Sequence, residues 1–429
     1  MKHSIPVSKL GPFGRPMADA VQSCVHCGFC LPTCPTYQVL GEEMDSPRGR
    51  ITLMKQVLEG TLPLEEAQPH LDACLGCLAC ETACPSGVQY RGLISPFRAM
   101  SEPRRDRALS DRLRRWVLLR LLPYPDRFEF AVRLGLLVRP LARFMPPSLR
   151  PMLDLLPAKM EAGGPLQERW QPPGKPRARI ALLAGCAQQV LAPRINRATI
   201  AVLLANDVEV IVPRQQACCG ALAWHVGAHD QAAACARQNV AVFPDDVDAI
   251  LTNAAGCGSC LHEYPLILSG TTDERAAGVL AKKAVDVAEF LVRIGLKPPA
   301  DTGRQITVAI QDACHLLHGQ HVQSAPRAVL QSIPGVALRE IADPEICCGS
   351  AGTYNLDHPG VARELGCRKA AALIASGAEV AVSGNIGCLT QLHAHLSAAG
   401  SPMRAVHTME LLADAYLQAA RLSPQSRTA

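Results

Sequence analysis

Two runs of cysteines near the N-terminus have the spacing that binds iron–sulfur clusters. The first run reads CVHCGFCLPTC over residues 24–34, the second reads CLGCLACETAC over residues 74–84, and a proline follows each. Both match the pattern C-x2-C-x2-C-x3-C-P, in which three cysteines hold one cubane cluster and the fourth ligates the other. A pair of zinc knuckles is the alternative, but a zinc site requires neither the third cysteine nor the final proline. The two runs therefore predict two [4Fe-4S] clusters.

Because the fourth cysteine of each run ligates the cluster of the other run, the ligands of each predicted cluster can be assigned. One takes Cys24, Cys27, Cys30 and Cys84, and the other takes Cys74, Cys77, Cys80 and Cys34. Two-residue gaps let a turning backbone aim three thiolates at one cluster while its amides point toward the cluster sulfurs. Between the runs, Arg48 and Arg50 have two interpretations: they stabilise a reduced cluster, or they belong to a solvated loop before a helix over 51–60 that stops at Gly60.

A third set of cysteines follows expected strands in a part of the chain that repeats itself once. In the first copy, the strands ARIALL, VEVIVP and DAILT lead to Cys186, Cys218, Cys219, Cys257 and Cys260. In the second copy, ITVAI, VALREI and AEVAVS lead to Cys314, Cys347, Cys348 and Cys388. Helical stretches such as 193–207 and 359–377 separate the strands, which predicts a parallel sheet in each copy. Because ligands bind beyond the carboxyl ends of parallel strands, the cysteines of each copy should converge.

Each pair of adjacent cysteines precedes a glycine, Gly220 or Gly349. A glycine permits a sharp turn there, and its missing Cβ lets a bulky inorganic group come close. Five thiols in the first copy suit a multinuclear iron–sulfur cluster, since a zinc ion takes four. In the second copy Gln391 stands in place of the fifth cysteine, and the remaining four thiols suit a cubane cluster, a zinc ion or no durable metal.

Other residues near these cysteines have ordinary structural explanations beside the functional ones. In the second copy His315 is an additional candidate ligand, although a histidine beside a strand end is more often only hydrogen-bonded. Two interpretations are open for Trp224, His225 and His229. They line a substrate pocket, or they are core and helix-cap residues. Cys235 and Cys367 lie in expected helices and match no ligand pattern, so we predict that both are small core residues.

The composition is that of a globular protein in a reducing compartment. The 429 residues are 48% hydrophobic and 19% charged, and the net charge of +5 is too small to require a nucleic acid as partner. No stretch has the apolar core of a signal peptide or the roughly 18 apolar residues of a membrane span. We expect a cytoplasmic chain whose 19 cysteines, an odd number, bind metal rather than form disulfides.

The segment 102–150 is basic and amphipathic. Its first part, EPRRDRALSDRLRRWVLLRLL, sets arginines among aliphatic residues around Trp116, and prolines interrupt the pattern further on. Such a segment lies on a membrane surface or docks on a partner subunit, or it is a connecting layer that buries its apolar stripe on the chain's own domains. The stretch 161–179 is rich in Gly and Pro and is predicted to be a linker.

The order of these motifs resembles a family of iron–sulfur oxidoreductases with CCG repeats. That family includes the iron–sulfur subunits of glycolate oxidase, lactate utilisation and anaerobic glycerol-3-phosphate dehydrogenase, and subunits of heterodisulfide reductase. The likeness is greatest to the glycolate oxidase iron–sulfur subunits, through CVHCGFCLPTCPTYQVLG, DSPRGRITLMKQVLEG, CETACPSGVQY and CCGSAGTYNLDHP. The resemblance implies an unusual cluster of double-cubane type at the first CCG site, where all five cysteines match, whereas Gln391 departs from the pattern in the second.

The resemblance implies an electron-transfer subunit of a flavin-linked dehydrogenase for glycolate and related 2-hydroxy acids. Separate flavin subunits would oxidise the substrate, and this chain would carry the electrons toward quinone. The residues agree, because the sequence has no dinucleotide fingerprint, phosphate loop or nucleophile elbow, so this chain alone should not oxidise a hydroxy acid. The alternatives are a disulfide reductase acting at a CCG site, the iron–sulfur subunit of a lactate or glycerol-3-phosphate dehydrogenase, and a zinc-stabilised scaffold.

The predicted fold is an α+β multidomain chain. A helical ferredoxin-like domain with two [4Fe-4S] clusters spans 1–101, a basic helical connector and linker spans 102–176, and two repeated α/β CCG domains with parallel sheets span 177–300 and 301–429. We expect an additional iron–sulfur cluster at the first CCG site, and iron–sulfur or zinc at the second. The expected partners are flavin-containing dehydrogenase subunits in a hetero-oligomer, with quinone and the inner face of the cell membrane as further contacts.

Overall fold

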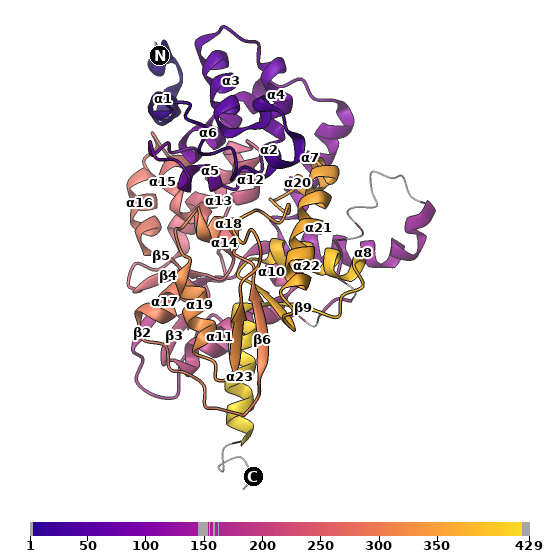
Figure 1. Cartoon of the computed structure of the whole chain (residues 1–429). Helices are drawn as coiled ribbons and strands as arrows, with labels where there is room; N and C mark the ends of the chain where they lie inside the picture. The colour runs from indigo at the N-terminus through magenta and orange to yellow at the C-terminus, as the bar shows by residue number, and fades with distance from the viewer. Residues whose placement is uncertain (1–2, 145–152, 154, 158, 162, 423–429) are drawn as a thin grey trace.

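The computed structural model describes residues 3–144, 153, 155–157, 159–161 and 163–422. Its N-terminal part is helical and forms one end of the molecule (Figure 1). The helices there are α1 (Gly14–Ser23), α2 (Pro35–Leu40), α3 (Pro47–Glu59), α4 (Leu64–Asp72), α5 (Ala79–Thr82) and α6 (Arg91–Ser101), with short 3-10 turns η1 (Val7–Lys9), η2 (Gly11–Phe13), η3 (Glu43–Asp45) and η4 (Glu102–Arg104). They enclose a core of Met17, Met54, Leu71, Leu93 and Phe97, all fully buried.

The helix predicted between the two cysteine runs is α3, and its ends have clear chemical causes. The Ser46 hydroxyl accepts a hydrogen bond from the Gly49 N–H at 3.1 Å, and Pro47 occupies the first helical position. Gly60 ends the helix in a left-handed conformation with φ +75°. The Gly60 stop is confirmed.

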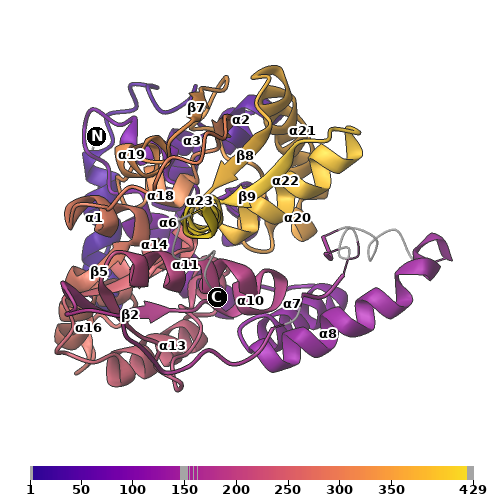
Figure 2. The same ribbon diagram turned by 90° about the horizontal axis from the view of Figure 1, so that it is seen from below.

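The basic segment forms two helices, α7 (Leu109–Leu121) and α8 (Pro125–Val138), followed by the turn η5 (Arg139–Phe144). Pro123 and Pro125 separate the helices, because proline removes a backbone donor and restricts the residue before it. Helix α7 touches both repeats: Arg114 Nη1 donates to the Leu356 carbonyl and Arg115 Nη2 donates to the Val226 carbonyl. Helix α8 contacts α7 and α10 (Cys186–Leu191) and runs outward from there at one side of the molecule (Figures 1 and 2). Residues 145–152 of the predicted connector lie outside the described residues.

The first repeat is built on a five-stranded sheet with the order β1-β3-β2-β4-β5. The strands are β1 (Arg169–Trp170), β2 (Ala178–Leu183), β3 (Val208–Ile211), β4 (Ala249–Thr252) and β5 (Ala284–Asp286). All pairings are parallel except that of β1, which lies in the predicted linker and pairs antiparallel with β3. The helices of this repeat are α10 (Cys186–Leu191), α11 (Pro193–Ala205), α12 (Ala221–His225), α13 (His229–Val242), α14 (Ala255–His262), α15 (Tyr264–Ile267), α16 (Glu274–Lys283) and α17 (Val287–Arg293).

The second repeat has a four-stranded sheet, all parallel, with the order β7-β6-β8-β9. Its strands are β6 (Ile306–Ile310), β7 (Val336–Arg339), β8 (Val380–Ser383) and β9 (Arg404–His407). Its helices are α18 (Cys314–Leu317), α19 (Ser324–Gln331), α20 (Tyr354–Asp357), α21 (Pro359–Ala375), α22 (Ile386–Ala398) and α23 (Thr408–Leu422). The predicted fold class, a helical domain followed by two α/β repeats with parallel sheets, is confirmed.

The two repeats share one hydrophobic core. Helix α23 packs against α11 of the first repeat, and Figure 2, which looks nearly along α23, shows it between the two sheets. The core joins Leu182 and Val210 of one sheet to Val308 and Val382 of the other. Each side chain of this size contributes about 1.5–3 kcal/mol when fully buried, so the repeats are held in a fixed relation.

Candidate iron–sulfur sites

The first cysteine site is a small cavity near the molecular surface. It is lined by Cys24, Cys27 and Cys30 of the first run together with Cys80 and Cys84 of the second run. The backbone turns round this cavity through left-handed conformations at His26 (φ 54°) and Gly28 (φ 88°). Cys27 is exposed, as are its neighbours Val25 (65%) and Phe29 (67%). The structure therefore brings Cys84 to the first run, at a place that another protein can approach.

The second cysteine site lies deeper. A cavity is lined by Cys34 together with Cys74, Cys77 and Cys80 of the second run. Cys34, Cys74 and Cys77 are buried. The Gly76 N–H donates to Cys74 Sγ at 3.4 Å, an amide-to-sulfur contact of the kind that stabilises cluster ligands. The structure groups Cys34 with the second run, and that these two sets of thiols hold clusters stays a prediction.

Of the two arginines considered, Arg50 is the one that lies beside the second site. Its side chain is 1% exposed, and its Nη1 lies 3.9 Å from Cys34 Sγ. Its Nε donates to the His70 carbonyl at 2.7 Å, and Nη2 forms an ion pair with Asp45 at 3.2 Å. Burial raises the pKa of the Cys74 thiol, but the charges of Arg50 and Arg98 outweigh it and hold that pKa below its ordinary value. Arg48 instead pairs with Glu43 near the first site and is partly exposed.

Arg50→Gln should have two measurable effects. Removing one partner of a buried ion pair leaves Asp45 with only the partly exposed His70 beside it, and should cost roughly 3–5 kcal/mol of folding free energy. Losing a positive charge next to Cys34 should also lower the one-electron reduction potential of the second site by about 59 mV or more, the equivalent of ~1.4 kcal/mol. Denaturation and a redox titration followed by EPR measure the two effects. Arg15→Gln, an exposed arginine on α1, is the matched control, and equal potentials in the two variants would contradict the assigned role.

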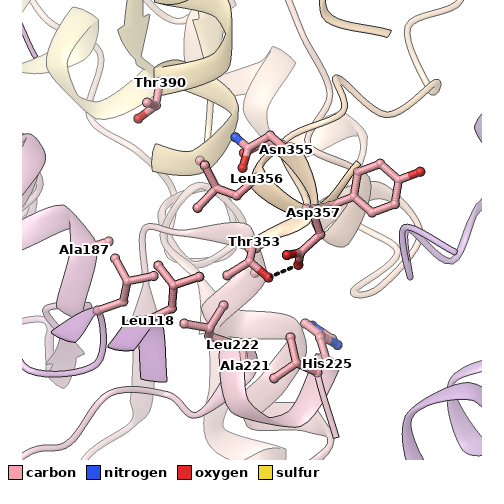
Figure 3. Close-up of a pocket in the computed structure, with 18 of the residues that line it drawn as sticks. Leu118, Ala187, Ala221, Leu222, His225, Thr353, Asn355, Leu356, Asp357 and Thr390 are labelled. Atoms are coloured by element: carbon pink, nitrogen blue, oxygen red, sulfur yellow. Dashed lines mark hydrogen bonds between the residues drawn. The ribbon is translucent and has the colours of Figure 1, made fainter. Parts of the chain in front are cut away.

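The cysteines of both repeats line one large cavity of about 620 Å³. Each group follows the carboxyl end of a parallel strand, as predicted. The first repeat provides Cys186, Cys218, Cys219 and Cys257, and the second provides Cys314, Cys347, Cys348 and Cys388. The Sγ atoms of Cys186 and Cys218 lie 3.2 Å apart, and those of Cys314 and Cys347 lie 4.0 Å apart. Figure 3 shows helices from several parts of the chain around this cavity, with Leu118, Ala187, Leu222, Leu356 and Thr390 among its walls.

Cys260, the fifth thiol of the first repeat, stands just behind the cavity wall. It is fully buried, and its Sγ donates to the Cys219 carbonyl at 3.1 Å. The matching residue of the second repeat, Gln391, is also buried, but its Nε2 donates to the Ala362 carbonyl of α21 at 3.1 Å. The amide is thus occupied by α21 and does not line the cavity, so the second repeat offers four thiols and no substitute ligand from this position.

The two predicted glycine turns are present. Gly220 and Gly349 both have φ +85°, a left-handed conformation that costs other residues about 1–2 kcal/mol. A Cβ on Gly349 would lie 2.6 Å from the Ala362 carbonyl oxygen, whereas one on Gly220 would lie 3.3 Å from the Ala232 oxygen. These turns set the direction of the thiols that precede them.

Substituting these glycines gives a graded test of the turns. Gly220→Ala should lower the free energy of unfolding by about 1–2 kcal/mol, the cost of the left-handed conformation alone. Gly349→Ala should lower it further, because the backbone of α21 must also move. Urea unfolding of the two variants and of the chain without substitution measures the three free energies of unfolding and therefore their ranking. If Gly349→Ala proved as stable as the unchanged chain, the turn geometry assigned here would be wrong.

The remaining candidates have mixed outcomes. Trp224 is completely buried and donates from Nε1 to Glu263 at 2.7 Å, so it belongs to the core. His229 is partly exposed at the start of α13, and its Nε2 lies 2.9 Å from the Ile267 carbonyl. His225 lines the large cavity, and its ring meets that of His315 edge to face, with centroids 5.2 Å apart. His315 Nε2 lies 3.0 Å from the Gly76 carbonyl, and burial lowers its pKa to about 4, so it is a neutral, hydrogen-bonded ring.

The two cysteines predicted to be core residues differ from each other. Cys235 on α13 packs against the core of the first repeat, and burial raises its pKa to about 12. Cys367 on α21 is exposed, with Sγ 3.5 Å from His395 Nδ1. The prediction for Cys367 is therefore wrong: a helical pattern places a residue on a helix but does not by itself say which face is covered.

Sequence reasoning missed how close the sites lie to one another. The pKa of Cys77 is raised well above its ordinary value, first by burial and then by the neighbouring Cys314 thiol, so the second N-terminal site adjoins the second repeat. The N-terminal helices are anchored there by Arg91, which donates to the Gly319 carbonyl at 2.9 Å, and by Tyr354, which donates to the Ala73 carbonyl at 3.0 Å. These residues are far apart in sequence, and no spacing pattern signals the contact.

The donor sets fit iron–sulfur clusters in their chemistry. Each iron of such a cluster takes a cysteine thiolate, and these thiols surround cavities that backbone amides also face. Hydrogen bonds with the Cys347 and Cys388 thiols hold the pKa of Cys348 well below its ordinary value, which favours the thiolate. Within the part of the chain that the structure describes, no group of three or more His, Cys, Asp or Glu side chains is arranged to hold a single metal ion.

Comparison with known proteins agrees with these sites. Residues 20–88 match the family model of the 4Fe-4S dicluster domain, and residues 180–262 and 308–393 each match that of the cysteine-rich CCG domain. The chain is 39% identical over 390 residues to the glycolate oxidase iron–sulfur subunit of Escherichia coli (strain K12), which covers 89% of this chain and 91% of that protein. The chain belongs to the family of glycolate oxidase iron–sulfur subunits.

Other relatives show how far the family extends. A probable glycolate oxidase iron–sulfur subunit of Bacillus subtilis (strain 168) is 36% identical over 417 residues, 92% of this chain and 93% of that protein. Lactate utilization protein A of Oceanobacillus iheyensis is 29% identical over 238 residues, 54% of this chain and 96% of that protein. The two domain matches support iron–sulfur clusters as cofactors of this chain. The number of clusters and the presence of zinc stay predictions.

Proposed function

We propose that this chain carries electrons from flavin-containing dehydrogenase subunits, which oxidise glycolate, toward quinone. Oxidation of a 2-hydroxy acid to a 2-oxo acid releases two electrons and two protons, and reduction of a quinone to a hydroquinone consumes the same number. The single observation that carries the proposal is the series of cysteine sites, which runs from an exposed site, through a buried one, to the large cavity between the repeats. Iron–sulfur clusters, when bound, take up and release single electrons.

The chain's own residues have distinct roles in this proposal. The N-terminal ligands are the two sets of four thiols already described, and the exposed Cys27 with Val25 and Phe29 forms the face for a flavin-containing partner. Buried thiols at the second site exclude water, and Arg50 provides a positive charge beside them. The nine thiols of the repeats hold the further metal centres, with five in the first repeat and four in the second. We propose the same domain bounds as the sequence predicted.

We also propose that the chain lies on the inner face of the cell membrane, through the outer faces of α7 and α8. Within the described residues, no helix has the length and apolar character needed to cross a bilayer. Large apolar side chains are nevertheless exposed on these two helices: Leu109, Leu113, Trp116, Phe130, Leu134 and Leu137. Arg112, Arg120 and Arg127 are exposed beside them, and such a basic amphipathic face binds anionic lipid.

Reconstitution tests the proposed function. Purified flavin-containing subunits, reduced by glycolate in the absence of oxygen, should pass electrons to a quinone only when this chain is added. D-Lactate and glycerol 3-phosphate as substrates distinguish the related dehydrogenases. Full quinone reduction by the flavin-containing subunits alone would refute the proposal.

A disulfide reductase is the second candidate function, because the open cavity beside the CCG cysteines has room for a substrate. In that case the reduced chain should cleave a small disulfide. It should do so without any hydroxy-acid dehydrogenase present.

A further inference from the structure

The large cavity has an apolar wall that the cysteine sites do not require. The end of α7, the turn after it and α8 contribute aliphatic or aromatic residues, Leu118, Leu121, Leu122, Phe128, Ala131 and Val132, whereas the start of α7 contributes the charged Asp111, Arg114 and Arg115. Leu153 and Leu156 complete this wall. The volume, about 620 Å³, falls within the roughly 300–1,000 Å³ of small-molecule pockets. Thiolate-bound inorganic clusters need thiols and amides around them, so this wall points to a second, apolar occupant.

A second observation concerns a buried cation in the same cavity. Arg105 lines the cavity with a side chain that is only 2% exposed, and its Nη1 is paired with Asp72 at 2.5 Å. Its Nε and Nη2 have no hydrogen-bond partner among the described residues. Nε2 of His225, on the same cavity, is likewise unpartnered. The Arg105 nitrogens are donors, and buried donors without an acceptor are rare in folded proteins, so they mark a place for an oxygen acceptor that comes from a ligand.

The apolar wall and the buried Arg105 together specify the chemistry of the ligand. One end must present carbonyl-type oxygens to Arg105, which lines the same cavity as the thiols, and the remainder must be apolar and fit beneath α7 and α8. A small polar disulfide would leave the apolar wall unused. A lipid-soluble quinone has two ring carbonyl groups and an apolar tail, and the same two helices that line the cavity carry exposed apolar side chains on their outer faces, which suit contact with lipid.

We propose that the cavity between the repeats binds a lipid-soluble quinone, with its ring between Arg105 and the thiols and its tail against the inner faces of α7 and α8. The proposal rests on the proposed function, since it names the site at which the electron acceptor binds. It assigns to α7 and α8 the role of a roof over the acceptor, in addition to their contact with the membrane.

Photolabelling of the full chain tests the site without relying on turnover. The probe is a short-chain azidoquinone, applied without oxygen to the chain as purified with its clusters, followed by peptide mass spectrometry. Label should appear within 118–135, at 153 or at 155–156, and excess unlabelled quinone should suppress it. Label confined to other segments would overturn the proposal, as would label that a small disulfide displaces and quinone does not.

A pair of matched substitutions tests the same site by affinity. Ala131→Trp fills the cavity from α8, whereas Ala371→Trp places the same side chain on the exposed face of α21. Ala131→Trp should weaken equilibrium binding of decylubiquinone roughly tenfold or more, and Ala371→Trp should leave it unchanged. Equal affinities in the two variants, with iron content and circular dichroism preserved, would overturn the proposal. If Ala131→Trp does not fold, the labelling pattern of the unchanged chain decides alone.

A water-soluble electron acceptor separates this proposal from the proposed function. In the reconstituted complex, Ala131→Trp should reduce ferricyanide at the normal rate and lose quinone reduction. This result would show that Ala131→Trp removes the quinone site and leaves the rest of the electron path intact. Quinone reduction by the flavin-containing subunits without this chain refutes the relay itself.

Discussion

Cys27→Ser should stop electron transfer from the flavin-containing partner to quinone while leaving reduction of the partner's flavin by glycolate intact. Cys27 is exposed, so serine in its place disturbs little packing, and the effect should come from the loss of a thiolate ligand. Changing the surroundings of a metal ligand commonly costs about 10- to 100-fold in affinity or activity, and loss of the ligand itself should cost more. Quinone reduction by the reconstituted complex, measured beside stopped-flow flavin reduction, gives both quantities.

The matched control for Cys27→Ser is Cys367→Ser. Cys367 is also exposed, but it lies on α21 outside every thiol group described above. The control should retain iron content and full quinone reduction. A Cys27→Ser complex that reduced quinone as fast as the control would show that the exposed N-terminal site is not on the electron path.

Cys219→Ser should remove the metal centre of the first repeat and leave the N-terminal clusters in place. Cys219 occupies the middle of its thiol group, because hydrogen bonds to the Cys218, Cys257 and Cys260 thiols are the leading causes that shift its pKa. Because the Cys219 thiol contacts all three of these thiols, a small movement of any one of them cannot replace it. Iron per chain should fall by the content of that centre, and quinone reduction should fall by more than roughly 10- to 100-fold.

Cys235→Ser is the control for that substitution. Cys235 lies on α13 beside the same site, with its Cβ 3.4 Å from the position a Cβ on Gly220 would take, yet it does not line the cavity. Its replacement should preserve iron content. If Cys219→Ser kept all of its iron, the five-thiol assignment in the first repeat would fail, whatever happened to stability.

The features that the sequence predicts well are those that depend on local spacing. Cysteines two residues apart share a turn, so three of each tetrad lie together, and the proline pattern tells which cysteine crosses over. The end of α3 follows from Gly60, and the strands that lead to Cys186 and Cys314 follow from short β-branched and aliphatic runs. Apart from the crossover, which joins the two runs, the deciding interactions are made within about ten residues.

The features that the sequence does not predict depend on contacts between distant segments. Nothing in the spacing shows that Arg50 rather than Arg48 is buried beside Cys34, since both lie in the same short stretch and only the packing of α3 and α4 separates them. Arg169 and Trp170 sit in a Gly- and Pro-rich stretch, and they become strand β1 because the edge of β3 offers backbone partners. The shared cavity arises only when α7, α8 and both repeats meet.

The most direct test of the account is EPR spectroscopy of the full chain, purified without oxygen and reduced with dithionite, together with iron and acid-labile sulfide analysis. We expect a brown protein whose reduced form gives signals of two interacting [4Fe-4S] clusters, with additional iron that Cys219→Ser removes. A folded, colourless chain free of iron and sulfide that still supported quinone reduction with its flavin-containing partner would contradict it.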